Sequence, residues 1–326
     1  MNFNDFNLLK NKRFLVTGGA GFIGSNIVDV LIKMGNIVRV LDNFSTGKWE
    51  NIYAHLNNNL FELIVGDIRD IETCRKACEG IDYVLHQAAL GGVTRSILYP
   101  KETNDVNITG TINMFVAARD QGIKRFVYAS SSSVYGDEKN LIKEEKKTGK
   151  PLSPYAVSKR ANELYAKNFY DLYKLQCIGL RYFNVFGKRQ NPNSIYAAVI
   201  PTFIKKLIDN ESPIIDGDGM QSRDFTYIEN VIEANLKACV SGVESYGEVF
   251  NIAYGERTSI IDLFKKLCEL IGKDIKPTFG PRRIGDIMHT NADISLARRV
   301  LGYNPKYDIN KGLELTTQWY KHYILY

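Results

Sequence analysis

RFLVTGGAGFIG, at residues 13–24, is the stretch that decides the fold of this chain. Its first residues, Arg13–Val16, predict a short buried strand, and apolar residues recur at helical spacing from Ile27 to Ile32. The turn between the two elements carries glycines three residues apart, at Gly18, Gly21 and Gly24. Such glycines let the backbone approach a pyrophosphate at the N-terminus of the following helix. The stretch therefore predicts a dinucleotide-binding turn, although an ordinary strand–turn–helix unit can share this pattern.

The second predicted strand, Ile37–Leu41, ends at Asp42, about 20 residues after the glycines, where dinucleotide-binding folds place a ribose-binding carboxylate. A carboxylate would repel the 2′-phosphate of NADP, so Asp42 favours NAD. The alternative is that Asp42 and Asn43 only form a turn.

Alternating strands and helices through the first half predict an α/β fold, a Rossmann-type doubly wound parallel sheet. Further strands are expected at Phe61–Asp67, Tyr83–Gln87, Arg125–Ala129, Gln176–Leu180 and Val249–Ile252. The intervening elements are expected to be a helix at Ile71–Cys78, a loop at Leu90–Pro100 and a helix at Thr103–Gln121. We expect an NAD-binding domain at residues 1–187, with returning segments near 225–255, and a smaller C-terminal α/β domain at residues 188–326. The later helices are expected near Ser259–Ile271, Ile294–Leu301 and Ile309–Tyr323.

A tyrosine and a lysine at helical spacing follow four serines, Ser130–Ser133, at the end of a predicted strand. Tyr155 and Lys159 lie four residues apart behind Pro154, which suits the first turn of a helix, so they share one helix face. An ammonium near a phenol lowers the tyrosine pKa, which would make Tyr155 a general base. The spacing alone is weak, because it recurs at Tyr135/Lys139, Tyr170/Lys174 and Tyr307/Lys311.

The composition, 44% hydrophobic and 24% charged, is typical of a soluble globular protein. No apolar run is long enough for a membrane span, and the first residues lack a signal-peptide core, so a cytoplasmic location is expected. The net charge of +6 is scattered, which argues against a nucleic-acid partner. The five cysteines form no CxxC pair and the four histidines are dispersed, so no metal site is predicted.

Several motifs together resemble the extended short-chain dehydrogenase/reductase family, specifically its nucleotide-sugar epimerases. They are Thr17–Gly24, Asp42-Asn43, Gly66–Ile68, His86–Ala89, Ser130–Gly136, Pro154–Lys159, Arg181–Gly187, Asp216–Gly219, Ser222–Phe225 and Arg283–Asp286. The resemblance covers nearly the whole chain and is greatest to bacterial UDP-N-acetylhexosamine 4-epimerases of polysaccharide synthesis. It implies a tightly held NAD and a homodimer formed through the helices Thr103–Gln121 and Pro154–Tyr173.

The resemblance also implies the residue roles. Tyr155 would take a proton from the sugar 4-hydroxyl while C4 gives a hydride to NAD, and Lys159 would hold the nicotinamide ribose. Ser131 would hydrogen-bond the 4-oxygen, and the 4-keto sugar would turn over and regain the hydride on its other face. Residues implied to bind NAD are Gly18, Gly21, Phe22, Ile23, Gly24, Asp42, Asn43, Ser45, Gly47, Asp67, Ile68, Gln87, Ala88, Ala89, Asn107, Ser130, Tyr155, Lys159, Tyr182 and Val185. Those implied to bind the UDP-sugar are Gly91, Gly92, Arg95, Ser131, Ser132, Ser133, Asn184, Ala198, Val199, Asp216, Arg223, Arg283, Asp286 and Thr290.

The sugar itself is predicted from two positions. Members restricted to UDP-glucose and UDP-galactose carry a tyrosine where this chain has Thr290, and the smaller side chain leaves room for an N-acetyl group. UDP-GlcNAc and UDP-GalNAc are therefore expected, with the uronic acid forms left open through Arg95. The loop Gly91–Arg95 departs from the Gly-Ser-Val-Pro-Arg of the similar enzymes.

Three other functions were weighed against this one. A UDP-glucose or UDP-glucuronate 4-epimerase would use the same residues. A 4,6-dehydratase or a decarboxylase would need acidic side chains where Ser132 and Ser133 stand. A non-catalytic NAD-binding regulator would be expected to lose the Tyr155/Lys159 pair.

Arg282 joins Arg223 and Arg283 as a candidate for binding the phosphates.

Overall fold

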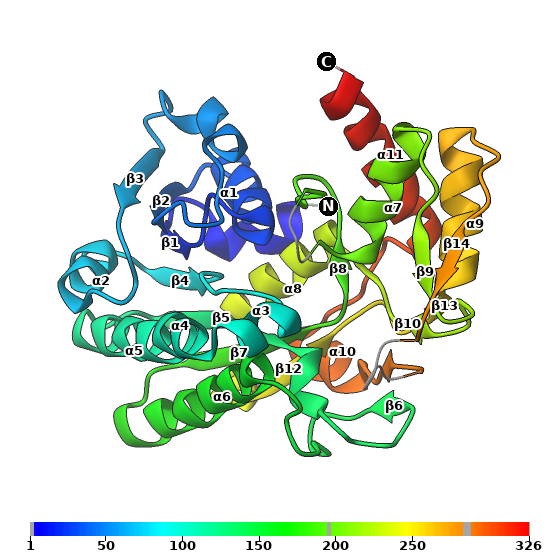
Figure 1. The fold of residues 1–326 in the computed structure, drawn as a ribbon. Coiled ribbons are helices and arrows are strands. Elements are labelled where there is room, and N and C mark those ends of the chain that lie inside the picture. The colour runs from blue at the N-terminus through cyan, green and yellow to red at the C-terminus, as the bar shows by residue number, and fades with distance from the viewer. Residues whose placement is uncertain (1–2, 194–196, 283–287, 326) are drawn as a thin grey trace.

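The computed structural model describes residues 3–193, 197–282 and 288–325, and is built around one parallel sheet (Figure 1). The seven strands lie in the order β12-β7-β5-β4-β1-β2-β3. Their bounds are β1 (Arg13–Thr17), β2 (Ile37–Asp42), β3 (Phe61–Val65), β4 (Tyr83–His86), β5 (Arg125–Ser131), β7 (Cys177–Tyr182) and β12 (Val249–Ile252). The predicted Rossmann-type sheet is confirmed, and its order reverses between β1 and β4, where such folds bind their ligands.

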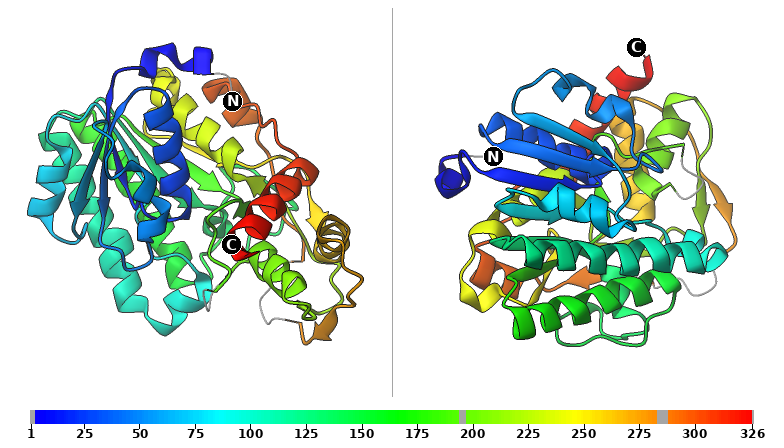
Figure 2. Two further views of the ribbon diagram at one scale, coloured as in Figure 1. Left: turned by 90° about the horizontal axis from the view of Figure 1, so that it is seen from above. Right: turned by 90° about the vertical axis from the view of Figure 1, so that its left-hand side faces the viewer.

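Helices cover both faces of this sheet because successive residues of a buried strand point to opposite sides (Figure 2). On β1, Phe14 and Val16 belong to one core cluster and Leu15 to the other. The first cluster also takes residues from α1 (Phe22–Lys33) and α8 (Ile228–Val240). The second takes residues from α2 (Ile71–Cys78), α5 (Thr111–Asp120) and α6 (Pro154–Tyr173).

The segment before α5 differs from the prediction of a loop at Leu90–Pro100. It holds two short helices, α3 (Val93–Leu98) and α4 (Pro100–Asn104), so the helix expected from Thr103 begins earlier. Gly92 and Pro100 suggest a loop, but here each stands at a helix start, which is a favoured place for proline. A π-helical turn then continues from α4 into α5.

Strand ends also differ by a few residues. The strand predicted to reach Asp67 ends at Val65, and the one predicted to end at Ala129 continues to Ser131. The extension arises because Ser130 and Ser131 pair with the neighbouring strand β7. The serines are thereby held by the sheet instead of by a free turn.

The remaining elements lie beside the carboxyl side of the sheet (Figure 1). Helices α7 (Val199–Ile208), α9 (Ile260–Ile271) and α11 (Ile309–Leu325) contact one another. Between them run the short strands β8 (Val185–Phe186), β9 (Ile214–Asp216), β10 (Ser222–Arg223), β11 (Thr226–Tyr227), β13 (Thr258–Ser259) and β14 (Thr278–Gly280). The strands β6 (Ile142–Lys143) and β15 (Asn291–Ala292) form a pair of their own. Helix α10 (Ser295–Leu301) contacts β12 and α8 and so packs against the central sheet.

None of the helices in the described part of the chain is both long and apolar enough to cross a lipid bilayer.

The cysteines are free, and burial raises the pKa of both Cys74 and Cys78 to about 12, so these two thiols stay protonated at neutral pH.

Candidate active site

The glycine-rich turn after β1 is packed so tightly that two of its residues must be glycine. Gly18 has a φ of +66°, and a Cβ there would lie 2.8 Å from the backbone nitrogen of Ala88. At Gly24, in the first turn of α1, a Cβ would lie 2.1 Å from the carbonyl oxygen of Gly18. The turn is therefore packed against Ala88, just beyond β4, and against the first turn of α1. A ligand at this turn would meet the N-terminus of α1.

Asp42 ends β2 beside this turn. Its carboxylate accepts hydrogen bonds from the amides of Ala20 at 2.9 Å and Phe44 at 2.8 Å. Burial raises the pKa of Asp42, although the two amide bonds oppose this. Each oxygen retains a further lone pair, so the carboxylate can still accept bonds from two ribose hydroxyls.

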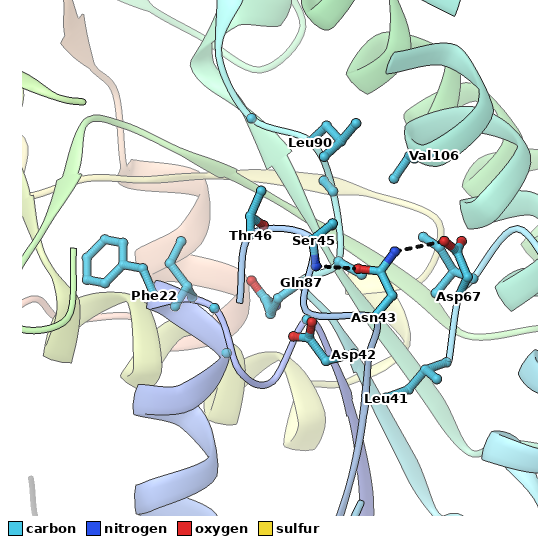
Figure 3. A pocket seen from close by; sticks show the side chains of 18 of the residues that line it. Phe22, Leu41, Asp42, Asn43, Ser45, Thr46, Asp67, Gln87, Leu90 and Val106 are labelled. Carbon is cyan, nitrogen blue, oxygen red and sulfur yellow. Dashed lines mark hydrogen bonds between the residues drawn. The ribbon is translucent and has the colours of Figure 1, made fainter. Parts of the chain in front are cut away.

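A cavity of about 300 Å³, here the cofactor cavity, opens between the turn, Asp42 and the end of β4 (Figure 3). Asn43 shapes its rim by donating to Asp67 at 2.7 Å and accepting from the amide of Ser45 at 3.0 Å. Residues predicted to bind NAD that line it are Gly18, Gly21, Phe22, Ile23, Gly24, Asp42, Asn43, Ser45, Asp67, Ile68, Gln87, Ala88 and Ala89.

Two of the predicted NAD residues stand behind the wall of this cavity. A Cβ at Gly47 would lie 2.8 Å from Asp42 Oδ1, so Gly47 serves the packing of that carboxylate. Asn107, in the π-helical turn, is buried and bonds the backbone of Leu90 at both nitrogen (2.8 Å) and oxygen (3.0 Å). It therefore shapes the loop after β4, and Leu90 in turn lines the cavity.

A second cavity of about 270 Å³, here the catalytic cavity, adjoins the first. The two share Ile23, Gln87, Ala89 and Gly91. The other residues around the second cavity are Ala129, Ser130, Ser131, Tyr155, Lys159, Tyr182 and Val185. The structure thus brings Ser131, Tyr155 and Lys159, from β5 and α6, to one space next to the predicted nicotinamide end.

Local capping fixes the start of α6 and so the direction of its two polar side chains. Ser153 caps the helix by accepting from the amide of Ala156 at 3.1 Å, and Pro154 occupies the first turn. Lys159 Nζ lies 5.9 Å from the centre of the Tyr155 ring and donates to the carbonyl oxygen of Ala129 at 2.8 Å.

The predicted lowering of the tyrosine pKa by Lys159 is not seen in this structure. Burial raises the pKa of Tyr155, and a hydrogen bond with Ser131 opposes it. Burial also lowers the pKa of Lys159 to about 8, against the charge of Glu163. The difference arises because Lys159 points to a backbone carbonyl, while desolvation acts on both groups.

A third cavity, of about 310 Å³ and here called the substrate cavity, lies among the elements beyond β7. Five predicted substrate residues line it, namely Asn184, Ala198, Val199, Asp216 and Arg223. Arg223 is held by the carbonyl oxygens of Ser222 (2.9 Å) and Met288 (3.2 Å), and Asn184 donates to that of Asp224 at 2.9 Å. A guanidinium and an amide on one wall are suited to phosphate and base oxygens.

The remaining predicted substrate residues are more scattered. The Ser131 and Ser133 hydroxyls lie 3.0 Å apart, and Ser132 begins a 3-10 turn. Gly92 precedes α3 with a φ of +105°, Arg95 lies 3.4 Å from Glu102, and Thr290 donates its amide to the oxygen of Ser222, next to Arg223. Arg282 faces Asp218 at 3.8 Å and does not line the substrate cavity. Arg283 and Asp286 lie outside the described residues.

Residues 14–253 match the family model described as the NAD dependent epimerase/dehydratase family. The chain belongs to this family. It is similar to a UDP-N-acetylglucosamine 4-epimerase of Methanobrevibacter ruminantium M1, solved with UDP-N-acetylmuramic acid (41% identity, 96% of this chain and 99% of that one, TM-score 0.90). It is also similar to a UDP-glucuronic acid 4-epimerase of Bacillus cereus, solved with UDP-glucuronic acid and NAD (34%, 96% and 100%, TM-score 0.88). A UDP-glucose 4-epimerase of Mycolicibacterium smegmatis is 35% identical over 95% of this chain and 99% of its own length.

NAD is the cofactor of the NAD-dependent epimerase/dehydratase family, and the residues of this chain fit it. The turn at Gly18 and Gly24 has no room for side chains, and Asp42 ends β2 beside it, as expected of a carboxylate that binds the ribose of NAD.

The sequence analysis missed some of the residues that line the cofactor and substrate cavities. In the cofactor cavity they are Leu41, Thr46, Gly66, Leu90 and Val106, and in the substrate cavity Ala197, Thr202, Phe203, Ile214, Ile215, Gln221, Phe225 and Ile260. Most are apolar or small side chains, which carry no chemical signal. The five in the cofactor cavity were detectable, because each adjoins a predicted NAD residue.

Proposed function

We propose that this protein is an NAD-dependent 4-epimerase that interconverts UDP-GlcNAc and UDP-GalNAc. The observation that carries the proposal is the meeting of Tyr155, Ser131 and Lys159 around a cavity that adjoins the cofactor cavity. A base next to the cofactor's reactive end is what oxidation of a sugar hydroxyl requires.

In the proposed reaction, bound NAD supplies a hydride acceptor that later returns the hydride to C4. Tyr155 accepts the proton of the sugar 4-hydroxyl and gives it back after the sugar has turned over. Ser131, already hydrogen-bonded to Tyr155, bonds the 4-oxygen and keeps it in line with the phenol. Burial favours the neutral phenol, and the buried positive charge of Lys159 would offset this once the phenolate forms. The cycle consumes no second substrate.

The residues that line the substrate cavity favour one orientation of a bound UDP-sugar. Arg223 and Asn184 would meet the diphosphate and the uracil, so the hexose would extend toward the catalytic cavity. Thr290 does not line the substrate cavity, but its amide bonds the backbone oxygen of Ser222 beside Arg223, and its side chain is small enough to leave space for an acetamido group. The 41% identity to a UDP-N-acetylglucosamine 4-epimerase supports the same sugar class.

A panel of UDP-sugars tests this function. Purified protein would be incubated with UDP-GlcNAc, UDP-GalNAc, UDP-glucose, UDP-galactose and UDP-glucuronate, and the C4 configuration read by proton NMR. We expect the fastest conversion with the two N-acetylated sugars. Faster conversion of UDP-glucose or UDP-glucuronate would contradict the sugar assignment, and no conversion of any would contradict the reaction.

The same panel addresses the dehydratases, which share the family description. Eliminating water from C5 and C6 needs an acid and a base beside the sugar, whereas Ser132 and Ser133 do not titrate near neutrality. The spectra should therefore show no 4-keto-6-deoxy sugar.

We further propose the homodimer expected from the sequence, formed through Thr103–Gln121, which is mainly α5 and the π-helical turn before it, and through α6. Helix α6 exposes an apolar stripe at Val157, Leu164, Tyr165 and Leu172, and the adjoining segment exposes Ile97, Leu98 and Tyr99. Residues seven or eight apart on a helix lie on one face, so this stripe can pack against a second copy of itself.

A further inference from the structure

Glu163 is a buried carboxylate one helical turn after Lys159 on α6, and it is 4% exposed. Its Oε1 accepts hydrogen bonds from Ser130 Oγ at 2.6 Å and from Arg181 Nε at 2.7 Å. Its Oε2 accepts from Arg181 Nη2 and from Arg160 Nη1, both at 2.8 Å. Four donors fix the position of this carboxylate, because charge-assisted bonds in a buried site are short and strong.

Two charged side chains of α6 therefore hold successive residues of β5. Lys159 donates to the carbonyl oxygen of Ala129, and Glu163 accepts the hydroxyl of Ser130. The next residue of β5 is Ser131, whose hydroxyl carries the proposed contact with the sugar. The geometry of that contact depends on both attachments.

The negative charge of Glu163 also acts on Lys159 and raises the pKa of its ammonium. The charged and titratable groups around the two residues are Arg160 and Tyr155 on α6, Arg181 on β7, Tyr128 on β5, Tyr135 after β5 and His86 on β4. Burial lowers the pKa of His86 to about 3 and raises those of Tyr128 and Tyr135, so these three groups are neutral near pH 7. Although burial opposes it, hydrogen bonding to Arg181 holds the pKa of Glu163 below its usual value.

We propose that Glu163 is a positioning residue that keeps Lys159 protonated and fixed against β5 while Tyr155 exchanges its proton. This inference rests on the proposed function. Burial lowers the pKa of Lys159 to about 8, although the negative charge of Glu163 opposes this lowering. Without the carboxylate the ammonium would lose its proton at a lower pH, and the phenolate would lose its stabilising charge.

The test is the pH profile of kcat/KM for UDP-GlcNAc in Glu163→Gln, Glu163→Asp and Arg160→Gln. Glutamine keeps the size and one acceptor oxygen but removes the charge, whereas aspartate keeps the charge. Arg160→Gln is the matched control, because it removes a bond to Oε2 and leaves the carboxylate. We expect Glu163→Gln to move the alkaline limb down by roughly one pH unit or more, the effect of an opposite charge at short range. Its kcat should fall more than its KM rises, and aspartate should restore most of the wild-type profile.

A folding defect is the chief competing explanation, since Glu163→Gln leaves Arg181, which is fully buried, without its ion-pair partner. The double variant Glu163→Gln/Arg181→Gln removes both charges and carries the test if the single variant does not fold. An alkaline limb unchanged in a folded variant lacking the carboxylate, or moved equally by Arg160→Gln, would overturn the proposal.

A second readout is independent of turnover. The side-chain signal of Lys159 in carbon-13-lysine-labelled, NAD-loaded protein, assigned with Lys159→Met, would be followed against pH. We expect it to titrate at a lower pH in Glu163→Gln than in the wild type, and equal midpoints would contradict the inference. If the wild type converted no UDP-sugar, the proposed function would fail while this titration still decided the role of Glu163.

Discussion

The proposed chemistry depends on a few side chains whose pKa values differ from those of the same side chains in water. Lys159 is buried and Tyr155 is half-buried, and desolvation lowers the pKa of the ammonium and raises that of the phenol, so each shift favours the neutral group. Ser131 is the contact that opposes this at the phenol. The lysines of the three other tyrosine/lysine pairs at this spacing are exposed, so the spacing alone does not create such surroundings.

Tyr155→Phe should leave folding and NAD content intact and reduce kcat by at least about two orders of magnitude, the usual contribution of general acid–base catalysis. Tyr170→Phe is the matched control, because Lys174 Nζ lies 5.8 Å from the Tyr170 ring, much as Lys159 lies from Tyr155. Steady-state turnover of UDP-GlcNAc measures both variants. Near-normal turnover of Tyr155→Phe would remove this residue from the mechanism.

Thr290→Tyr should exclude the acetamido group and so lower kcat/KM for UDP-GlcNAc much more than for UDP-galactose. Thr290→Ser, which keeps the pocket open, is the control and should retain both activities. Equal losses on the two sugars would show that Thr290 does not select the sugar, and the loop Gly91–Arg95 would then be examined in its place.

At the scale of elements, close backbone contacts decide where helices begin. Helix α1 can start against the turn only because residue 24 has no side chain, and α3 starts after Gly92 in a conformation that favours glycine. The π-helical turn between α4 and α5 places Asn107 against the backbone of Leu90. Such irregular turns are frequent at functional sites.

Gly24→Ala should destabilise the protein by about 1–3 kcal/mol, the usual cost of overpacking, because the added Cβ would meet a backbone oxygen at 2.1 Å. The affinity for NAD should fall as well, because the added Cβ would displace the N-terminus of α1 from the glycine-rich turn. Gly242→Ala is the control, since its Cβ would meet nothing within 4 Å. Denaturant unfolding and a fluorescence titration with NAD measure the two effects, and wild-type values for both would contradict the packing argument.

At the scale of the whole molecule, the three cavities lie in two different parts of the fold. The carboxyl edge of the sheet carries the cofactor and catalytic cavities, and the elements beyond β7 carry the substrate cavity. Helices α5 and α6 lie side by side on one outer face (Figure 2). The apolar stripe of α6 is the part of this face that we assign to a second copy of the chain.

Leu164→Lys should halve the mass measured by light scattering, because a charge in an apolar interface is costly to bury. Leu164 is 55% exposed in the single chain, so the substitution should leave the folded monomer intact. Leu8→Lys, at an exposed leucine distant in sequence, is the control and should keep the wild-type mass. A wild-type mass for Leu164→Lys would place any dimer contact elsewhere.

The sequence by itself determined the features that depend on short stretches of chain. Glycine spacing, a proline in the first turn of a helix and apolar periodicity are local, so the dinucleotide turn, the start of α6 and the strands of the sheet could be predicted from residues such as Gly18 and Pro154. The family motifs similarly predicted most of the residues that line the cofactor cavity.

Only the tertiary structure decided what depends on residues distant along the chain. Desolvation of Lys159 follows from packing between α6 and β5, and the four bonds to Glu163 come from three different elements. The two short helices before α5 were missed because Gly92 and Pro100 serve loops and helix starts equally well. Burial and long-range pairing are properties of the folded chain, so the sequence predicted the candidate reactive groups, whereas the fold decides their pKa values and positions.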